Sequence, residues 1–195
     1  MSSLLTLSSS NAQVVGSSPI GGSFKEDILM EINREENKRL CDTYPFLIPF
    51  NRFSGKRINC GEKGFWPDSP DEMPPEWDYE YTELDDMPDG WRIAFGEQMC
   101  AEIKQALLDE GGEKLLDEYR VDQIKEKYGY LRWYDNFSTE RTRAIVDKYE
   151  VISSRTCIKC GKPATKLSRG WIAPWCDECG NGNPEEYMNL DKAFI

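Results

Sequence analysis

The sequence contains no histidine among its 195 residues. Histidine is the commonest general base near neutral pH, so the chain has no Ser-His or Cys-His nucleophile pair. A Walker-type phosphate loop and a Gly-x-Gly-x-x-Gly stretch are missing as well. These absences argue against the common hydrolase and nucleotide-binding classes, although a mechanism built on carboxylates stays open. We therefore predict a non-enzymatic protein.

Long apolar runs are also absent. No stretch approaches the roughly 20 apolar residues that a membrane span needs, and the start MSSLLTLSSS lacks the basic residues and long apolar centre of a signal peptide. We expect a soluble, cytoplasmic protein with no membrane partner. The seven cysteines are an odd number, and four of them have a metal-type spacing. This pattern favours zinc in a reducing compartment over a disulfide framework.

The metal-type spacing consists of two Cys-x2-Cys pairs, Cys157 with Cys160 and Cys176 with Cys179. Each pair can place two sulfurs on one side of a tetrahedral ion. Four thiolates fill the coordination shell of Zn²⁺, whereas a catalytic zinc keeps one position open for water or substrate. The spacing therefore predicts a structural Zn²⁺ and a zinc ribbon over residues 157–180.

The net charge of −11 is unevenly distributed. Residues 68–89, called the acidic segment below, carry ten Asp or Glu and no Lys or Arg, which leaves 24 basic against 25 acidic residues elsewhere. The zinc ribbon is locally basic, with Arg155, Lys159, Lys162, Lys166 and Arg169. These cations exceed what four thiolates around Zn²⁺ need. They could face nucleic acid or dock on the acidic segment, and we favour the acidic segment.

Hydrophobic periodicity predicts helices over 24–41, 89–110 and 139–153, with a short helical piece at 113–119. The helix over 89–110 is the clearest, because apolar residues recur every four positions from Trp91 to Leu107. Prolines predict an extended stretch over 44–58. The alternation of Trp77, Tyr79 and Tyr81 with polar residues predicts a short strand.

The fold class that follows is α+β: two or three amphipathic helices packed on a small antiparallel sheet, with a C-terminal zinc ribbon. Residues 1–22 are predicted to be a disordered tail, because they cannot bury enough apolar surface. The α+β core then spans 23–156, the ribbon 157–180 and a C-terminal tail 181–195. Within the ribbon, 164–167 and 170–172 are expected to be short strands.

The stretch 120–136 predicts a β-hairpin that turns at Lys127-Tyr128-Gly129. Tyr130, Arg132 and Tyr134 share one face of it, and Leu131 and Trp133 share the other. An arginine between two tyrosines is typical of a stacking platform for bases or of a cation-binding cage. An ordinary aromatic ladder in a sheet has the same pattern, so this alternative stays open.

Several of these motifs occur in one order: Gly90-Trp91, KEKYGYLRWY at 125–134, SSRTCIKCG at 153–161, Gly170-Trp171 and CDEC at 176–179. This order resembles a family of small uncharacterised bacterial and phage proteins, whose signature is similar to KEKFGxLRFY followed by a Cys-rich ribbon. Tyr128 and Trp133 stand where phenylalanine is common in that family, and Cys179 where some members carry histidine. The resemblance implies four zinc ligands and a phage accessory role, and it leaves residues 1–89 uncovered.

The sequence therefore favours a zinc-stabilised binding protein that engages another protein through an acidic surface, with a host protein as the partner if the phage resemblance holds. One alternative is a nucleic-acid-binding protein that uses the basic ribbon and the hairpin. A second alternative is a small-molecule-binding protein or enzyme with a pocket near Arg132. The oligomeric state stays open. The candidate partner-binding residues are Tyr130, Arg132, Tyr134, Lys166, Arg169, Asp78, Glu80, Asp85 and Asp86.

Overall fold

The computed structural model describes residues 33–50 and 79–193. The predicted tail over 1–22, the start of the helix predicted over 24–41 and Asp78 lie outside these residues. In the part of the chain that is described, no helix is both long and apolar enough to cross a bilayer.

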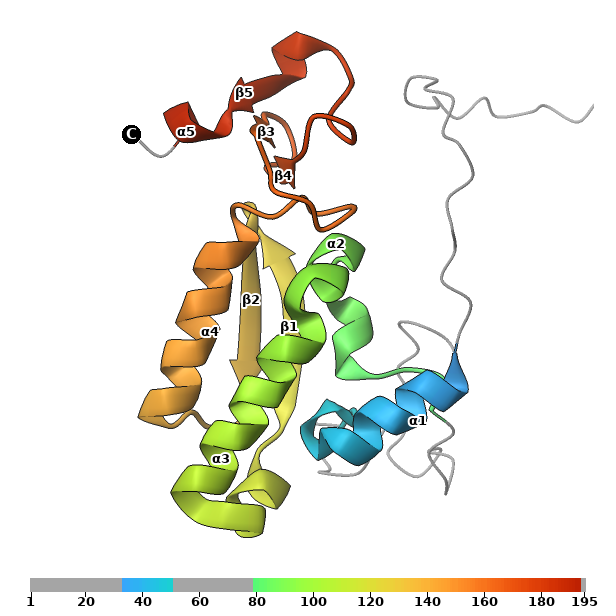
Figure 1. The fold of residues 1–195 in the computed structure, drawn as a ribbon, viewed down its shortest axis with the longest axis vertical. Helices are drawn as coiled ribbons and strands as arrows, with labels where there is room; N and C mark the ends of the chain where they lie inside the picture. The colour runs from blue at the N-terminus through green and yellow to red at the C-terminus, as the bar shows by residue number, and fades with distance from the viewer. Residues whose placement is uncertain (1–32, 51–78, 194–195) are drawn as a thin grey trace, which may run out of the picture. The chain divides into compact units, whose positions relative to one another are not determined.

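A β-hairpin forms the centre of the described core (Figure 1). Strand β1 (Val121–Lys127) pairs antiparallel with β2 (Tyr130–Asp135). Tyr128 and Gly129 connect them with φ values of 55° and 81°, as a two-residue hairpin turn of the I′ kind requires. The predicted hairpin and its turn are confirmed.

Two helices, α3 (Glu97–Glu118) and α4 (Glu140–Ser153), pack on the hairpin and on each other. Alternation along the strands buries Ile124, Leu131 and Trp133 on the helix side. The N–H of Leu131 donates to Oγ of Ser153 at 2.8 Å, so the end of α4 satisfies a backbone donor of β2.

A continuous helical run contributes most to the core. It comprises α2 (Asp89–Trp91), the π-helix η4 (Arg92–Gly96) and α3. The predicted four-residue spacing holds, since Trp91, Phe95, Met99, Ile103 and Leu107 are all buried. Inside α3, Gly112 has a φ of 66° and interrupts the helix. This interruption falls between the helix predicted over 89–110 and the helical piece predicted over 113–119.

The remaining core elements surround this run. Helix α1 (Arg34–Thr43) overlaps the helix predicted over 24–41 and ends two residues beyond it, and Leu40 and Cys41 are its buried apolar residues. Helix η3 (Glu83–Asp86) contacts β1. Together with the hairpin these helices make an α+β fold, as predicted.

Two local predictions in this region were wrong. Residues 45–47, predicted to be extended, form the 3-10 helix η1 (Pro45–Leu47), because proline is favourable in the first turn of a helix, where no N–H is needed. The residues of the predicted aromatic strand that the structure describes, 79–82, form no strand. Tyr79 instead has a φ of 62°, which is incompatible with a regular strand.

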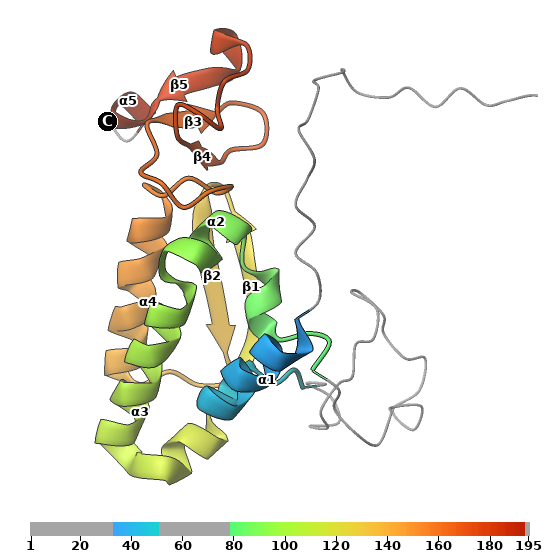
Figure 2. The ribbon, with the colours of Figure 1, turned by 45° about the vertical axis from the view of Figure 1, so that its right-hand side comes forward.

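The C-terminal region forms a second antiparallel sheet, with strand order β4-β3-β5 (Figure 2). Its strands are β3 (Lys166–Ser168), β4 (Pro174–Trp175) and β5 (Tyr187–Asn189). The sequence placed the second ribbon strand at 170–172, a few residues too early. It also assigned 181–195 to a tail, whereas η5 (Pro184–Glu186), β5 and α5 (Leu190–Ala193) extend the ribbon.

Candidate metal centre and neighbouring surfaces

The first Cys-x2-Cys turn follows α4 almost directly. The N–H of Gly161 donates to the carbonyl oxygen of Cys157 at 3.0 Å, and the N–H of Cys157 donates to the carbonyl oxygen of Lys162 at 2.7 Å. Gly161 has a φ of 76°, which glycine adopts without steric cost. These hydrogen bonds form a tight turn that places the thiols of Cys157 and Cys160 on one side.

The second turn repeats this geometry. The N–H of Gly180 donates to the carbonyl oxygen of Cys176 at 2.8 Å, and the N–H of Cys179 points to Sγ of Cys176 at 3.4 Å. An amide that donates to sulfur favours the thiolate form, which is the form that binds metals. Both turns are therefore built to present sulfur ligands.

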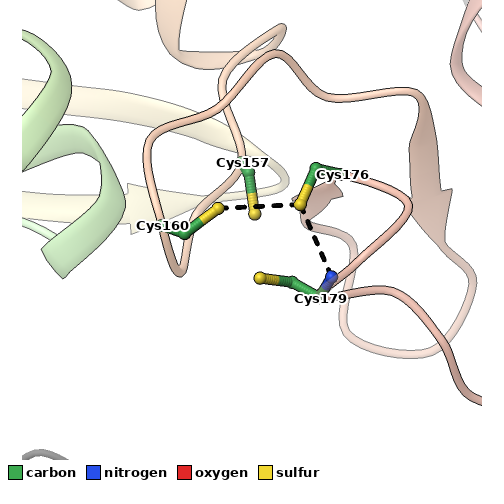
Figure 3. Close-up of side chains that lie close together, drawn as sticks. All are labelled: Cys157, Cys160, Cys176 and Cys179. Carbon is green, nitrogen blue, oxygen red and sulfur yellow. Dashed lines mark hydrogen bonds between the residues drawn. The ribbon is translucent and has the colours of Figure 1, made fainter.

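The two turns bring their four thiols together (Figure 3). The Sγ atoms of Cys157, Cys160, Cys176 and Cys179 all lie within 4.8 Å of one another, and those of Cys160 and Cys176 are 3.6 Å apart. Four sulfurs at about 2.3 Å from a tetrahedral zinc are roughly 3.8 Å apart. The cluster therefore has the donor atoms and the size to hold a metal ion.

Burial and hydrogen bonding affect the thiols differently. Burial raises the pKa of Cys160 and of Cys179. Burial also acts against the Cys176 thiolate, but the N–H of Cys179 and the neighbouring thiols outweigh it and lower the pKa of Cys176. A metal ion would compensate the cost of keeping all four groups deprotonated.

The first Cys turn packs tightly on the start of the core helix. The N–H of Gly90 donates to the carbonyl oxygen of Ile158 at 2.9 Å, and Nε1 of Trp91 donates to that of Thr156 at 2.9 Å. A Cβ at Gly90 would clash with the carbonyl oxygen of Cys157 and lie 2.7 Å from that of Ile158. Ile158 is itself part of the hydrophobic core. The cluster of four thiols is therefore joined to the core and belongs to the same compact unit.

Three of the five basic residues named for the ribbon pair with acids of the C-terminal region. Lys162 lies 2.6 Å from Glu178, Lys166 lies 3.1 Å from Asp177, and Arg155 lies 3.6 Å from Asp191. The structure describes the acidic segment from residue 79 onwards, where Glu80 pairs with Arg34 and Asp85 pairs with Arg92. Lys166 also donates to the carbonyl oxygen of Gly180 at 3.1 Å. The exposed ion pairs of the ribbon contribute little to stability.

Three acidic candidates of the sequence analysis have partners inside the core. Glu80 forms an ion pair with Arg34. Asp85 pairs with Arg92 and also accepts from the N–H of Thr82 at 2.6 Å, which caps η3. Asp86 is hydrogen-bonded to Tyr81 and is exposed. Much of the described acidic segment therefore has a role in folding.

The hairpin places Tyr130, Arg132 and Tyr134 on the face opposite the buried one, as its alternation requires. Arg132 lies over the ring of Tyr130, 5.6 Å from its centroid, and forms an ion pair of 2.5 Å with Glu150 of α4. Burial raises the pKa of Glu150 against the opposing effect of Arg132. Tyr134 instead lies beneath Lys125, at 4.9 Å, so the two tyrosines do not share one cation.

A cavity of about 580 Å³ lies in the ribbon. Lys166, Asp177, Gly180 and Tyr187 are among its lining residues, whereas Arg132 is not. The candidates Lys166 and Arg132 therefore belong to different surfaces. Arg169 is exposed, and among the described residues its side chain has no ion pair.

Trp171 and Glu126, which were not among the predicted site residues, also lie at the hairpin. Nε1 of Trp171 donates to Oε2 of Glu126 at 2.8 Å, and the N–H of Gly129 donates to Oε1 of Glu126 at 2.7 Å. One carboxylate therefore ties the ribbon loop to the hairpin turn. In the sequence, Trp171 was indicated only by the Gly170-Trp171 motif of the family resemblance, which did not predict its contact with Glu126.

Comparison of the chain with protein-family models, with curated proteins and with solved structures gives no match.

Proposed function

We propose that this chain is a non-enzymatic binding protein in which a structural Zn²⁺ holds the ribbon against the α+β core. The observation that carries the proposal is the approach of four thiols within 4.8 Å of one another. Sulfur donors favour zinc over harder ions such as Mg²⁺ or Ca²⁺. Four protein thiolates also complete a tetrahedral shell, so water and substrate have no free position.

The contacts of the cluster support a structural role. Gly90 and Trp91 bond to the backbone that carries Cys157, so a metal that fixes the first Cys turn also fixes the start of the core helix. Binding of zinc to such a site contributes roughly 10 kcal/mol or more. This is comparable to the whole stability of a typical domain, about 5–15 kcal/mol.

The acidic segment is the candidate surface for a protein partner. Asp86 and Asp89 are its exposed carboxylates among the residues described, and carboxylates on a surface attract a basic patch on another protein. If the resemblance to phage proteins holds, this partner is a host protein. A pull-down at low and high salt tests the idea, because recovery that does not depend on salt would contradict recognition by charge.

The metal proposal is tested by elemental analysis and thermal melting of the purified full chain. We expect about one zinc per chain and a large drop in melting temperature when a chelator removes it. Cys160→Ser should lower the zinc content, whereas Cys100→Ala, which removes a buried thiol outside the cluster, should leave the content unchanged. Metal-free protein that melts like the purified protein would refute the structural role.

A further inference from the structure

The outer face of the β1–β2 hairpin, opposite Ile124, Leu131 and Trp133, combines cations with aromatic rings. The cation of Lys125 lies 4.9 Å from the ring centroid of Tyr134, that of Arg132 lies 5.6 Å from Tyr130, and that of Lys127 lies 5.8 Å from Tyr128. Each cation is within the range of a cation–π interaction. The outer face is thus a basic, aromatic surface on a chain of net charge −11.

Two of these cations, Lys125 and Arg132, are placed where they do not favour folding. Lys125 and Arg132 are directly opposite each other across the strands, and like charges in this position repel. Glu150 compensates Arg132, but Lys125 donates to the neutral side chain of Gln123 at 2.7 Å. An anionic ligand on this face would remove the repulsion.

Tyr128 has an unfavourable backbone conformation as well. Its φ is 55° and its side chain is 69% exposed. Bulky residues rarely adopt positive φ, and asparagine or glycine is favoured at this position of the turn. An exposed tyrosine gains little packing in return. Strained residues of this kind cluster at binding sites.

Trp171 adds a second exposed ring at the hairpin turn. Its side chain is 61% exposed, and its Nε1 donates to Glu126, whose other oxygen accepts from the N–H of Gly129. The indole therefore keeps its polar atom satisfied within the protein while much of its surface faces solvent. A planar apolar group held in this way is suited to stacking.

We propose that the outer face binds single-stranded nucleic acid together with the hairpin tip, where Tyr128 is exposed and Trp171 is held by Glu126 of the opposite face. Lys125, Lys127 and Arg132 contact phosphates, and bases stack on Tyr128 and Trp171. The planar rings favour this ligand over an acidic peptide, which would need the cations alone, and over a duplex, whose bases are not free to stack. The site rests on the proposed function, because the ribbon carries Trp171.

The test is fluorescence anisotropy with a labelled oligo(dT) of about twelve nucleotides, a length within the usual site size, and the zinc-loaded full chain. We expect binding at about 50 mM salt. Two to three phosphate contacts predict a slope of log K against log salt of roughly −1.4 to −2.1. The affinity should then fall about 7- to 18-fold between about 50 and 200 mM salt.

Three variants separate binding from folding. Lys125→Gln should weaken binding and reduce the slope by about 0.7. Tyr128→Asn should weaken binding about 5- to 160-fold through the lost stack, while the melting temperature stays equal or rises because asparagine tolerates positive φ. Lys114→Gln removes an exposed lysine of α3 and should change neither the affinity nor the melting temperature.

Several results would overturn the proposal. One is a zinc-loaded, folded chain that gives no anisotropy change. Another is a Tyr128→Asn variant that binds the oligonucleotide as tightly as Lys114→Gln does. A third is displacement of the oligonucleotide by polyglutamate as effectively as by unlabelled oligo(dT). The last result would assign the face to an acidic protein. Zinc content and melting are measured on the same samples, so failure of this proposal is distinguishable from failure of the metal proposal.

Discussion

The contact between Gly90 and the first Cys turn predicts a large effect of one methyl group. In Gly90→Ala the new Cβ would meet the carbonyl oxygen of Cys157 and the backbone of Ile158, at 2.7 Å from the carbonyl carbon and from the oxygen. Backbone atoms within a hydrogen-bonded turn cannot rotate away as a side chain can. The start of the core helix must therefore move away from the metal cluster.

The cost has three parts. Overpacking of this kind costs about 1–3 kcal/mol. The displacement also stretches the bonds from Gly90 to Ile158 and from Trp91 to Thr156, both 2.9 Å, at about 1 kcal/mol each. Alanine recovers up to about 1 kcal/mol through its higher helix propensity. We expect a net loss of about 2–4 kcal/mol in the free energy of unfolding.

Urea unfolding of the zinc-loaded protein measures this loss as a lower midpoint at an unchanged slope. The matched control is Gly170→Ala, because a Cβ there meets nothing within 4 Å, and it should stay within about 0.5 kcal/mol of the parent. Gly90→Ala should also bind zinc more weakly than the control. Equal midpoints for the two variants would show that the turn does not pack on the helix as described.

Three further predictions concern the metal, the pH and the kink in α3. Cys160→Ser, or removal of the metal by a chelator, should abolish the cooperative unfolding transition of the ribbon in a melt followed by tryptophan fluorescence. The lost binding energy, roughly 10 kcal/mol, exceeds what so small a sheet can supply. Burial opposes the Glu102 carboxylate, but Lys148 and Tyr149 lower its pKa below the usual value of 4.5. The ionised Glu102 therefore stabilises the fold above pH 4.5, and this stabilisation is lost as the pH falls through its folded-state pKa. Glu102→Gln should cost about 0.5–1 kcal/mol in the free energy of unfolding at neutral pH and almost nothing below the folded-state pKa. Urea unfolding at the two pH values measures the difference. Gly112→Ala should cost about 1–2 kcal/mol in the same assay, because the φ of 66° is unfavourable for alanine although the space around it is open, and a neutral result would refute the strain argument.

The predictions that succeeded rest on local patterns. The spacing from Trp91 to Leu107 and the alternation from Ile124 to Trp133 are each set by the period of one element, and the structure buries these residues as expected. Each Cys pair is also local, and the two pairs meet because the short antiparallel strands β3 and β4 lie between them. The cluster of four thiols could therefore be predicted.

The predictions that failed depend on distant contacts. Strand β5 forms because Leu167 pairs with Met188 across twenty residues of intervening chain, and nothing near Met188 in the sequence indicates that pairing. Tyr79 leaves the strand conformation in a region where its carbonyl oxygen accepts from Asn37 at 2.9 Å. The partners of Asp85 and Arg132 are likewise set by the packing of helices, which composition does not encode.

The joint between Gly90 and Ile158 links residues 68 positions apart, and synthesis runs from the N-terminus to the C-terminus. The contacts of Gly90 and Trp91 with the first Cys turn can therefore form only after residues 156–158 have been synthesised. Until then Trp91 lacks the acceptor of its indole N–H, whereas Phe95 can already pack on Tyr149 of α4. The packing of the helix start is therefore completed late, together with the turn that carries Cys157 and Cys160.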